Sequence, residues 1–286
     1  MRKVLSLVKT RLRERSNKDL VTYRQLQLKL AGVPRYQPGF VTVADWRLNY
    51  LDAASLLSAF DVVVVKRWND FASKKKNPVI LDGGANIGIS AIHYKRLFPE
   101  AAITSFEPDP RACDCLRRNL AANEIHDVEV VEKALWTSNG RTTFFSEGAD
   151  ANRVVCADDE IKHLTSLTPV AKKFEVETVR LADYLGRTEF DLVKLDIESA
   201  EAEVIVDAGD TLRNVNNLVI EFHLTNSTPR PLARTLEALA DQGFNVSVCS
   251  YGPWVDLLHQ TSSLPNSKVE FDQNLLLCAW RGNPEA

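Results

Sequence analysis

The segment VILDGGANIGIS, residues 79–90, decides the fold class. Its apolar start, 79–81, predicts a buried strand, the glycines predict a tight turn, and NIGISAIHYKRLF predicts a helix. A strand, a glycine-rich turn and a helix in this order open many nucleotide-binding α/β sheets. The dinucleotide spacing G-x-G-x-x-G fails in both registers, because Ala85 or Asn86 stands at the middle glycine. No Gly-Lys-Ser/Thr follows, which excludes a Walker loop.

Asp82 places a carboxylate at the start of this turn, and its charge bears on the choice of cofactor. Beside a pyrophosphate, it would cost Coulomb energy that a low-dielectric crevice screens poorly. S-adenosylmethionine has no phosphate but carries an ammonium and a sulfonium group, and its own carboxylate suits a helix N-terminus. Asp82 therefore favours this cofactor. The alternative is an acid that only caps a helix beginning at Asn86.

Glu107 ends the next predicted strand, AITSFE (102–107), within the run FEPDP. An acid at this position can accept hydrogen bonds from both ribose hydroxyls of an adenosine. NAD and S-adenosylmethionine both carry that ribose, so Glu107 favours the second only in combination with Asp82. Asp109 is interpreted as the cap of the helix that follows.

Strands and helices alternate from residue 78 onward, and several strands are continuous apolar runs. This pattern predicts an α/β fold with a mainly parallel sheet and helices on both faces. Ligands of such sheets lie outside the carboxyl ends of the strands. We expect one strand over 128–135 with RTTFFS (141–146) as its hairpin partner, and a last, antiparallel strand over 274–280.

The chain is predicted to divide at residue 78. Residues 1–77 are expected to form an N-terminal helical extension and a short hairpin, within FVTVADWRLNYL. Residues 78–286 are expected to form the cofactor-binding domain, with an insertion near 146–173. This insertion, the N-terminal part and NSTPRP (226–231) are the segments expected to bind the second substrate.

Composition limits the partners and the location of the protein. The net charge of −3 over 286 residues gives no general reason to expect nucleic acid. Five cysteines without a CxxC spacing indicate reduced thiols and a cytoplasmic protein. No segment reaches the roughly 20 apolar residues of a membrane span. The basic N-terminus predicts an amphipathic helix, packed on its own domain or on another copy in a homo-oligomer; the alternative is peripheral contact with an anionic membrane.

A second polar group follows the later strands. Asp196 ends DLVKLD (191–196), and Glu198 lies in the next turn. The following strand carries Glu221 and His223, which share one face if the strand continues that far. We predict Asp196, Glu198 and His223 as catalytic residues.

Two kinds of chemistry suit this group. Asp196, Glu221 and His223 could hold a hard divalent cation such as Mg²⁺ against a substrate hydroxyl. Alternatively, His223 could act as a general base oriented by an acid, or could be a structural histidine. Glu201 and Glu203, in the first turn of the next helix, are interpreted as solvent-exposed residues that favour the helix dipole.

The segments LDGGANIGIS, FEPDP, VVEKAL and DLVKLDIESAEAEV, in this order, resemble the FkbM family of S-adenosylmethionine-dependent methyltransferases. Weaker agreement covers DWRLNYLDA and LVIEFH. The resemblance implies a Rossmann-like class I methyltransferase fold, usually with a seven-stranded sheet. It also implies O-methyltransferase activity on hydroxyls of sugars, glycans or polyketide-type natural products.

Residue roles follow by position from the same resemblance. The glycine loop would line the methionine end of the cofactor, Glu107 the ribose, Ala134 and Leu135 the adenine, and Asp196 the methyl group. The chain departs from the family's usual Val at Gly83 and usual Gly at Ser199, and the second change could alter the turn that positions Glu198. The complete set of expected cofactor-binding residues is Asp82, Gly83, Gly84, Ala85, Asn86, Gly88, Ser90, Glu107, Pro108, Ala134, Leu135 and Asp196.

The sequence therefore predicts an S-adenosylmethionine-dependent O-methyltransferase that acts on a small-molecule or glycan hydroxyl. One alternative is a non-catalytic scaffold with a methyltransferase fold, and the intact loop and Glu107 argue against it. The other is an NAD-dependent oxidoreductase, which Asp82, Ala85 and Asn86 argue against.

Overall fold

A computed structural model of the chain describes residues 17–146, 152–154, 172–224, 230–251 and 273–282. Most of the predicted insertion at 146–173, most of NSTPRP and the first 16 residues lie outside this part. Among the described residues, no helix combines the length and the apolar character that crossing a bilayer requires.

A seven-stranded sheet forms the centre of the molecule. Six strands run parallel, and β13 runs antiparallel to both of its neighbours, as predicted for the last strand. The strands, in spatial order, are β12 (Asn245–Tyr251), β13 (Gln273–Trp280), β11 (Asn217–Leu224), β10 (Leu192–Leu195), β3 (Val79–Gly83), β4 (Ala102–Phe106) and β5 (Val128–Val131).

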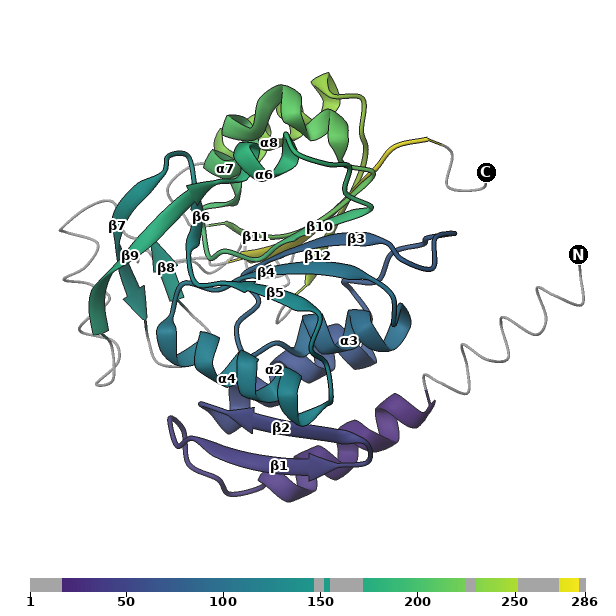
Figure 1. Ribbon diagram of the computed structural model, residues 1–286, viewed down its shortest axis with the longest axis vertical. Helices are drawn as coiled ribbons and strands as arrows, with labels where there is room; N and C mark the ends of the chain where they lie inside the picture. The colour runs from purple at the N-terminus through teal and green to yellow at the C-terminus, as the bar shows by residue number, and fades with distance from the viewer. Residues whose placement is uncertain (1–16, 147–151, 155–171, 225–229, 252–272, 283–286) are drawn as a thin grey trace, which may run out of the picture.

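Helices cover both faces of this sheet, as the apolar runs of its strands require (Figure 1). One face carries α6 (Leu181–Leu185), α7 (Glu201–Ala208), the 3₁₀ turn η2 (Gly209–Asn214) and α8 (Arg230–Asp241). The other carries α3 (Ile89–Leu97) and α4 (Pro110–Ala122). The predicted doubly covered α/β fold is confirmed. Asp109 caps α4 by accepting from the Arg111 amide, and Pro110 occupies its first turn.

A second, four-stranded sheet stands beside the carboxyl ends of the main sheet, at the left in Figure 1. It contains β6 (Ala134–Trp136), β9 (Lys172–Arg180), β7 (Gly140–Ser146) and β8 (Asn152–Val154). The prediction of one strand over 128–135 is therefore wrong: β5 ends at Val131, where the backbone turns and the amide of Lys133 donates to the Val131 carbonyl. The predicted hairpin is wrong as well, because β7 pairs with β9 and β8.

The N-terminal part packs against α3 and α4. It consists of a helix over residues 17–30, the hairpin of β1 (Gly39–Val43) and β2 (Trp46–Tyr50), α2 (Ala53–Phe60) and a π-helical turn, η1 (Asp61–Val65). These elements share one apolar cluster with α3 and α4. The division of the chain into domains at residue 78 stays a prediction.

The fully buried side chain of Asn119, on α4, links this N-terminal part to the glycine loop. Its oxygen accepts from the backbone and side-chain nitrogens of Asn49, at 2.6 and 3.0 Å. Its nitrogen donates to the carbonyl oxygens of Asn49 (2.9 Å) and Ile87 (2.8 Å). The hairpin, α4 and the loop are therefore held by one amide group.

Replacing Asn119→Ala should lower the free energy of unfolding by about 3 kcal/mol, because several buried backbone groups would lose their partner. Urea denaturation measures this loss. Asn123→Ala removes an amide from the end of the same helix, where it bonds Arg47 at a more exposed position. That control should lose about 1 kcal/mol or less. Equal, small losses in both variants would contradict the linking role of Asn119.

Candidate functional site

The glycine loop turns between β3 and α3 with three residues in the left-handed region: Gly84 (φ 73°), Asn86 (47°) and Gly88 (89°). The amides of Gly84 and Ala85 both donate to the carbonyl of Phe106, which binds the loop to the end of β4. A Cβ at Gly84 would overlap the carbonyl oxygen of Asp196. Glycine is required here both by the backbone angle and by the close approach of β10.

Glu107 follows β4 directly and is 4% exposed. One of its oxygens accepts from the Asn86 amide and the other from the Asp109 amide, both at 2.8 Å. Burial raises the pKa of the Glu107 carboxyl to about 7, although the two backbone hydrogen bonds oppose this shift. Each carboxylate oxygen keeps a second lone pair for a ligand hydroxyl.

Asp82 lies beneath the loop and is fully buried. Its Oδ2 accepts from the Ser90 hydroxyl at 2.6 Å, and its Oδ1 lies 3.5 Å from the ammonium of Lys194. That ammonium also donates to the carbonyls of Gly83 (3.2 Å) and Gly84 (2.7 Å). The negative charge of Asp82 is thus balanced by Lys194, a lysine of the neighbouring strand. Because its side chain is fully buried, Asp82 does not contact a ligand directly and influences one only by positioning the loop and Lys194.

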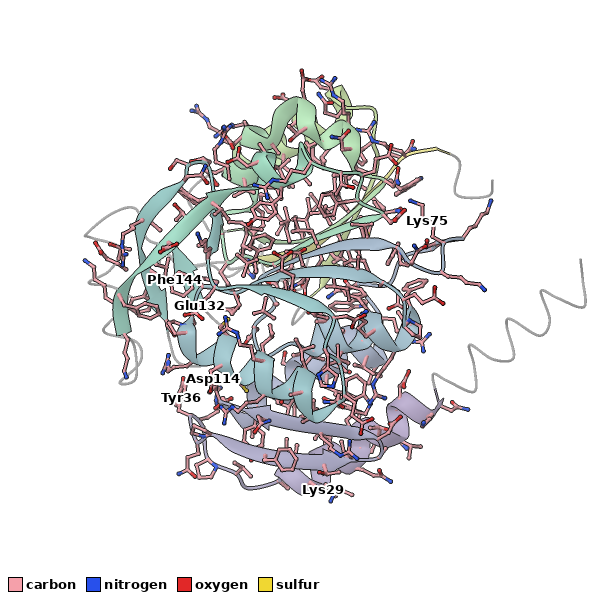
Figure 2. All side chains as sticks on the ribbon, in the orientation of Figure 1. Lys29, Tyr36, Lys75, Asp114, Glu132 and Phe144 are labelled. Carbon is pink, nitrogen blue, oxygen red and sulfur yellow. The ribbon has the colours of Figure 1, made fainter. Side chains whose placement is uncertain are left out.

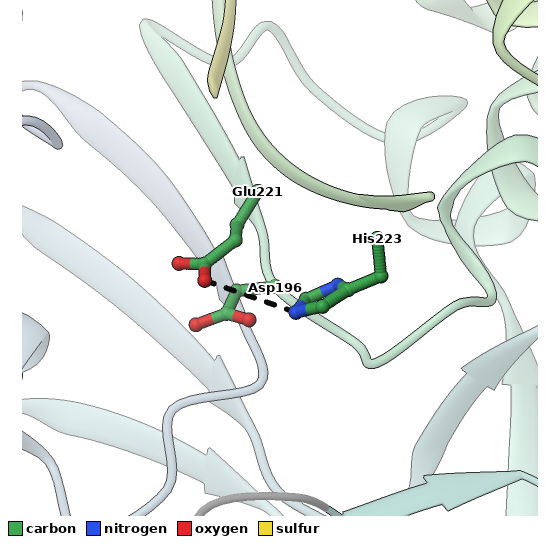
Figure 3. Close-up of side chains that lie close together, drawn as sticks. All are labelled: Asp196, Glu221 and His223. Carbon is green, nitrogen blue, oxygen red and sulfur yellow. Dashed lines mark ion pairs between the residues drawn. The ribbon is translucent and has the colours of Figure 1, made fainter. Parts of the chain in front are cut away.

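The carboxyl ends of β10 and β11 bring Asp196, Glu221 and His223 together, as Figure 3 shows. One ligand atom of each lies within 4.8 Å of the others, and His223 Nε2 is 3.8 Å from Glu221 Oε1. β11 continues to Leu224, so Glu221 and His223 share a face, as predicted.

Glu201 is the other partner of His223. It is 1% exposed, accepts from the amides of Ile197 and Ser199, and lies 3.4 Å from His223 Nδ1. The prediction that Glu201 is solvent-exposed is wrong: the side chain points back from the first turn of α7 under the preceding loop. This contact leaves His223 Nε2 directed at Glu198, whose Oε2 is 3.4 Å away.

Both members of the Glu198–His223 pair have shifted pKa values. Burial alone would lower the pKa of His223, but the hydrogen bond to Glu201 and the charges of Glu198, Glu201 and Asp196 raise it to about 10. Burial raises the pKa of Glu198 well above its usual value; the neighbouring carboxylates add to this shift, and His223 opposes it. The described site therefore holds a protonated imidazole at neutral pH.

Two adjoining hollows open at this edge of the sheet. The first, the cofactor cleft, is a slot lined by Phe106, Glu107, Pro108, Lys133, Ala134, Leu135, Phe144 and Ile197. The second, the polar cavity, measures about 430 Å³ and is lined by Asn69 and by residues of α2, η1, the glycine loop, the first turn of α3 and the ends of β10 and β11. Gly84, Asn86, Asp196 and Glu198 line both, so they form a common wall.

Comparisons with known proteins show the family of this chain. The family model described as "Methyltransferase FkbM domain" matches residues 82–246. The chain belongs to the FkbM methyltransferase family. It is an S-adenosylmethionine-dependent methyltransferase.

The chain is also similar to three methyltransferases from other organisms. Methyltransferase sdnD of Sordaria araneosa is 31% identical over 230 residues, which cover 70% of this chain and 87% of that protein. 2-O-methyltransferase NoeI of Sinorhizobium fredii is 31% identical over 159 residues, covering 52% and 65%. 31-O-demethyl-FK506 methyltransferase FkbM of Streptomyces tacrolimicus is 25% identical over 193 residues, covering 59% and 73%.

The predicted cofactor residues fall into three groups in this FkbM fold. Asp82, Gly83 and Gly88 line neither hollow, whereas Ala85 and Ser90 line the polar cavity. The remaining seven line the cofactor cleft: Gly84, Asn86, Glu107, Pro108, Ala134, Leu135 and Asp196.

Sequence reasoning missed several side chains of the site, among them Lys194, Glu201 and Phe144. Lys194 stands inside an apolar strand, a position that signals either a paired buried charge or an error in the strand assignment. Phe144, labelled in Figure 2, reaches the cleft from β7 of the second sheet. The sequence predicts this strand as the hairpin partner of residues 128–135, whereas it pairs with β9 and β8.

Both departures from the family's usual residues have a structural account. A Cβ at Gly83 would come within 2.8 Å of the Leu135 side chain, so Leu135 fills the space that a valine would need. Ser199 has φ 77°, in the left-handed region where the family's usual glycine is unstrained. Glu198, at φ 54°, precedes it, so the turn keeps its left-handed shape despite the serine.

Replacing Ser199→Gly should raise the free energy of unfolding by about 0.5 to 1 kcal/mol, because it relieves the left-handed strain. Chemical denaturation measures the change. Ser138→Gly, at an exposed position outside the left-handed region, is the matched control and should not stabilise the protein. A Ser199→Gly variant less stable than the wild type would contradict this account of the turn.

Proposed function

We propose that this enzyme transfers the methyl group of S-adenosylmethionine to a hydroxyl group of a small-molecule or glycan acceptor. The observation that carries the proposal is a histidine, His223, held by Glu201 and directed into the polar cavity beside the cofactor cleft. The printed names of two relatives, a 2-O-methyltransferase and a 31-O-demethyl-FK506 methyltransferase, describe transfer to oxygen in those proteins.

The residues of the cleft fit the cofactor. Glu107 would accept the ribose hydroxyls on its remaining lone pairs, and Ala134, Leu135 and Phe144 would border the adenine. The common wall at Gly84 and Asn86 would carry the methionine part into the polar cavity. Asp82, Gly83, Gly88 and Ser90 would support the loop from beneath, with Lys194 balancing the charge of Asp82.

His223 would remove the proton of the acceptor hydroxyl. S-adenosylmethionine supplies an activated methyl group when bound, so oxygen–carbon bond formation accompanies sulfur–carbon cleavage and the hydroxyl proton passes to His223 Nε2. Glu201 fixes the imidazole through Nδ1, which leaves Nε2 as the proton acceptor. Asp196 and Glu198, on the common wall, would orient the hydroxyl for in-line attack.

The proton already on His223 has to leave before this step. The pKa of His223 is high because carboxylates surround it, and a positive charge entering the same cavity lowers it again. Glu198, 3.4 Å from Nε2, lies close enough to share the displaced proton or pass it to solvent. The carboxylates of Asp196, Glu198 and Glu201 thus attract a cationic ligand. Once that ligand is bound, His223 loses its proton and can act as a base.

The second candidate mechanism places a divalent cation on Asp196, Glu221 and His223. The proximity of their ligand atoms, within 4.8 Å, favours it. A metal-bound imidazole must be neutral, so the cation would have to displace the proton of His223, as the cationic cofactor does in the base mechanism. Turnover that disappears on exhaustive chelation and returns with Mg²⁺ would replace the base mechanism by this one.

Acceptor binding is assigned to the outer wall of the polar cavity. Ser55 and Ser58 of α2 and Val62 and Val63 of η1 form that wall opposite the strand ends. Mixed hydroxyl and apolar groups suit a neutral, hydroxylated acceptor better than an anionic one, given the nearby carboxylates. The segments 146–173 and 226–231 remain proposed acceptor-binding pieces.

The proposed function is tested by transfer of a labelled methyl group from S-adenosylmethionine to a panel of hydroxylated acceptors. Labelling of amines alone would refute O-methylation.

The affinity for S-adenosylhomocysteine should rise with pH through about 7, the pKa of Glu107. Below that pH the carboxyl is protonated, and above it the carboxylate accepts more strongly from the ribose hydroxyls. Calorimetry should show roughly a tenfold gain between about pH 6 and about pH 8, the change in ionised fraction expected for that pKa. Glu107→Gln should bind more weakly at high pH and show a flat profile; a flat wild-type profile would refute the ribose assignment.

His223→Ala should lower kcat by a factor of about 10² to 10⁴, the usual contribution of a general base. Affinity for S-adenosylhomocysteine should change by less than about threefold, because this ligand lacks the positive sulfonium and His223 is assigned to the acceptor hydroxyl in the polar cavity. Glu201→Gln, which keeps the side-chain shape, should lower kcat by a smaller factor, since it weakens the orientation of the imidazole. Wild-type turnover in the His223 variant would remove His223 from the mechanism.

A further inference from the structure

The side chain of Asn69 faces the polar cavity from a turn that precedes the main sheet. It is 7% exposed, yet no hydrogen bond from another described residue is made to its amide group. Buried amide groups in proteins normally have partners. Because Asn69 lines the cavity and its amide has no partner among the described residues, the amide is available to a ligand group there.

Three anchors hold this turn rigidly while leaving the amide free. The Tyr94 hydroxyl donates to the backbone carbonyl of Asn69 at 3.2 Å. The next residue, Asp70, pairs with the buried His93 at 2.6 Å. Arg67, at the start of the turn, pairs with Asp19 at 3.0 Å. Such a preorganised side chain binds a ligand without an ordering cost of its own.

The anchors also locate Asn69 relative to α3. Tyr94 lies four residues after Ser90, so both occupy one face of this helix. Ser90 and Ile89, in its first turn, line the polar cavity together with Asn69. Asn69 therefore lines the same cavity as the N-terminal turn of α3, where the first backbone amides have no partner within the helix and favour a carboxylate.

We propose that the Asn69 side chain donates a hydrogen bond to the methionine carboxylate of the cofactor. This inference rests on the proposed placement of the cofactor, with adenosine in the cleft and the methionine part across the common wall. The cofactor site then includes the segment before residue 78 as well as the sheet. It also explains why the His93–Asp70 pair lies behind this turn: the pair positions Asn69 and does not contact the ligand.

The test compares two ligands that differ only at the group in question. S-adenosylhomocysteine carries the amino-acid group, whereas 5′-methylthioadenosine lacks it. By calorimetry, Asn69→Ala should bind S-adenosylhomocysteine about tenfold or more weakly, the usual effect of a lost hydrogen bond to a charged group. Its affinity for 5′-methylthioadenosine should stay within about twofold, as hydrogen bonds to adenosine are unaffected.

Two further variants separate this role from others. Asn69→Asp should weaken S-adenosylhomocysteine binding at least as much as Asn69→Ala, because it sets two carboxylates against each other. Asn123→Ala, remote from the cavity, should leave both affinities unchanged. Thermal unfolding of each variant checks that it is folded.

Unchanged S-adenosylhomocysteine affinity in Asn69→Ala would overturn the inference while leaving the proposed function intact. An equal loss for both ligands would overturn it too, since it would indicate a structural role. Tighter binding by Asn69→Asp would place the ammonium group at Asn69 and refute the contact with the carboxylate. Failure of the wild type to bind either ligand would refute the proposed cofactor placement itself.

Discussion

A buried ammonium group, that of Lys194, joins the strand ends on which the site is built. It donates to two carbonyls of the glycine loop and lies 3.5 Å from both Asp82 and Asp196. Without it, the fully buried Asp82 would be an unpaired charge, at a cost of several kcal/mol. Burial would lower the pKa of Lys194, but the charges of Asp196 and Asp82 raise it, so the ammonium persists. This one group therefore holds the glycine loop against the ends of β3 and β10.

The site consequently consists of the cofactor cleft and the polar cavity, separated by one common wall. Because the loop is held down by Lys194, its outer surface at Gly84 and Asn86 is shared by the cofactor cleft and the polar cavity. Asp196 and Glu198 complete that wall from the other side. A cofactor with its adenosine in the cleft and its methionine part across this wall would meet an acceptor in the polar cavity over a fixed backbone, which is the arrangement that a direct group transfer needs.

The N-terminal part is an integral component of this site. Asn119 bonds the hairpin to the glycine loop, and the apolar cluster beneath it includes residues of α2, α3 and α4. The same packing places α2, η1 and Asn69 over the cavity. In physical terms, the segment before residue 78 supplies a wall that a bare α/β sheet would leave open to water, and that wall strengthens the electrostatic interactions inside.

The sequence by itself determined the doubly covered α/β fold, the glycine loop, Glu107 at the next strand end and the pairing of Glu221 with His223. These follow from local patterns, namely apolar runs, glycine spacing and strand alternation. Only the tertiary structure decided the roles of Lys194, Glu201 and Asn69, and the pairing of β7 with β9. Each depends on a partner far away in the chain: β3 for Lys194, β11 for Glu201 and α3 for Asn69. A helix or strand pattern tells which residues share a face, but not what covers that face. A buried, paired charge and a solvated one therefore look alike until the chain is folded.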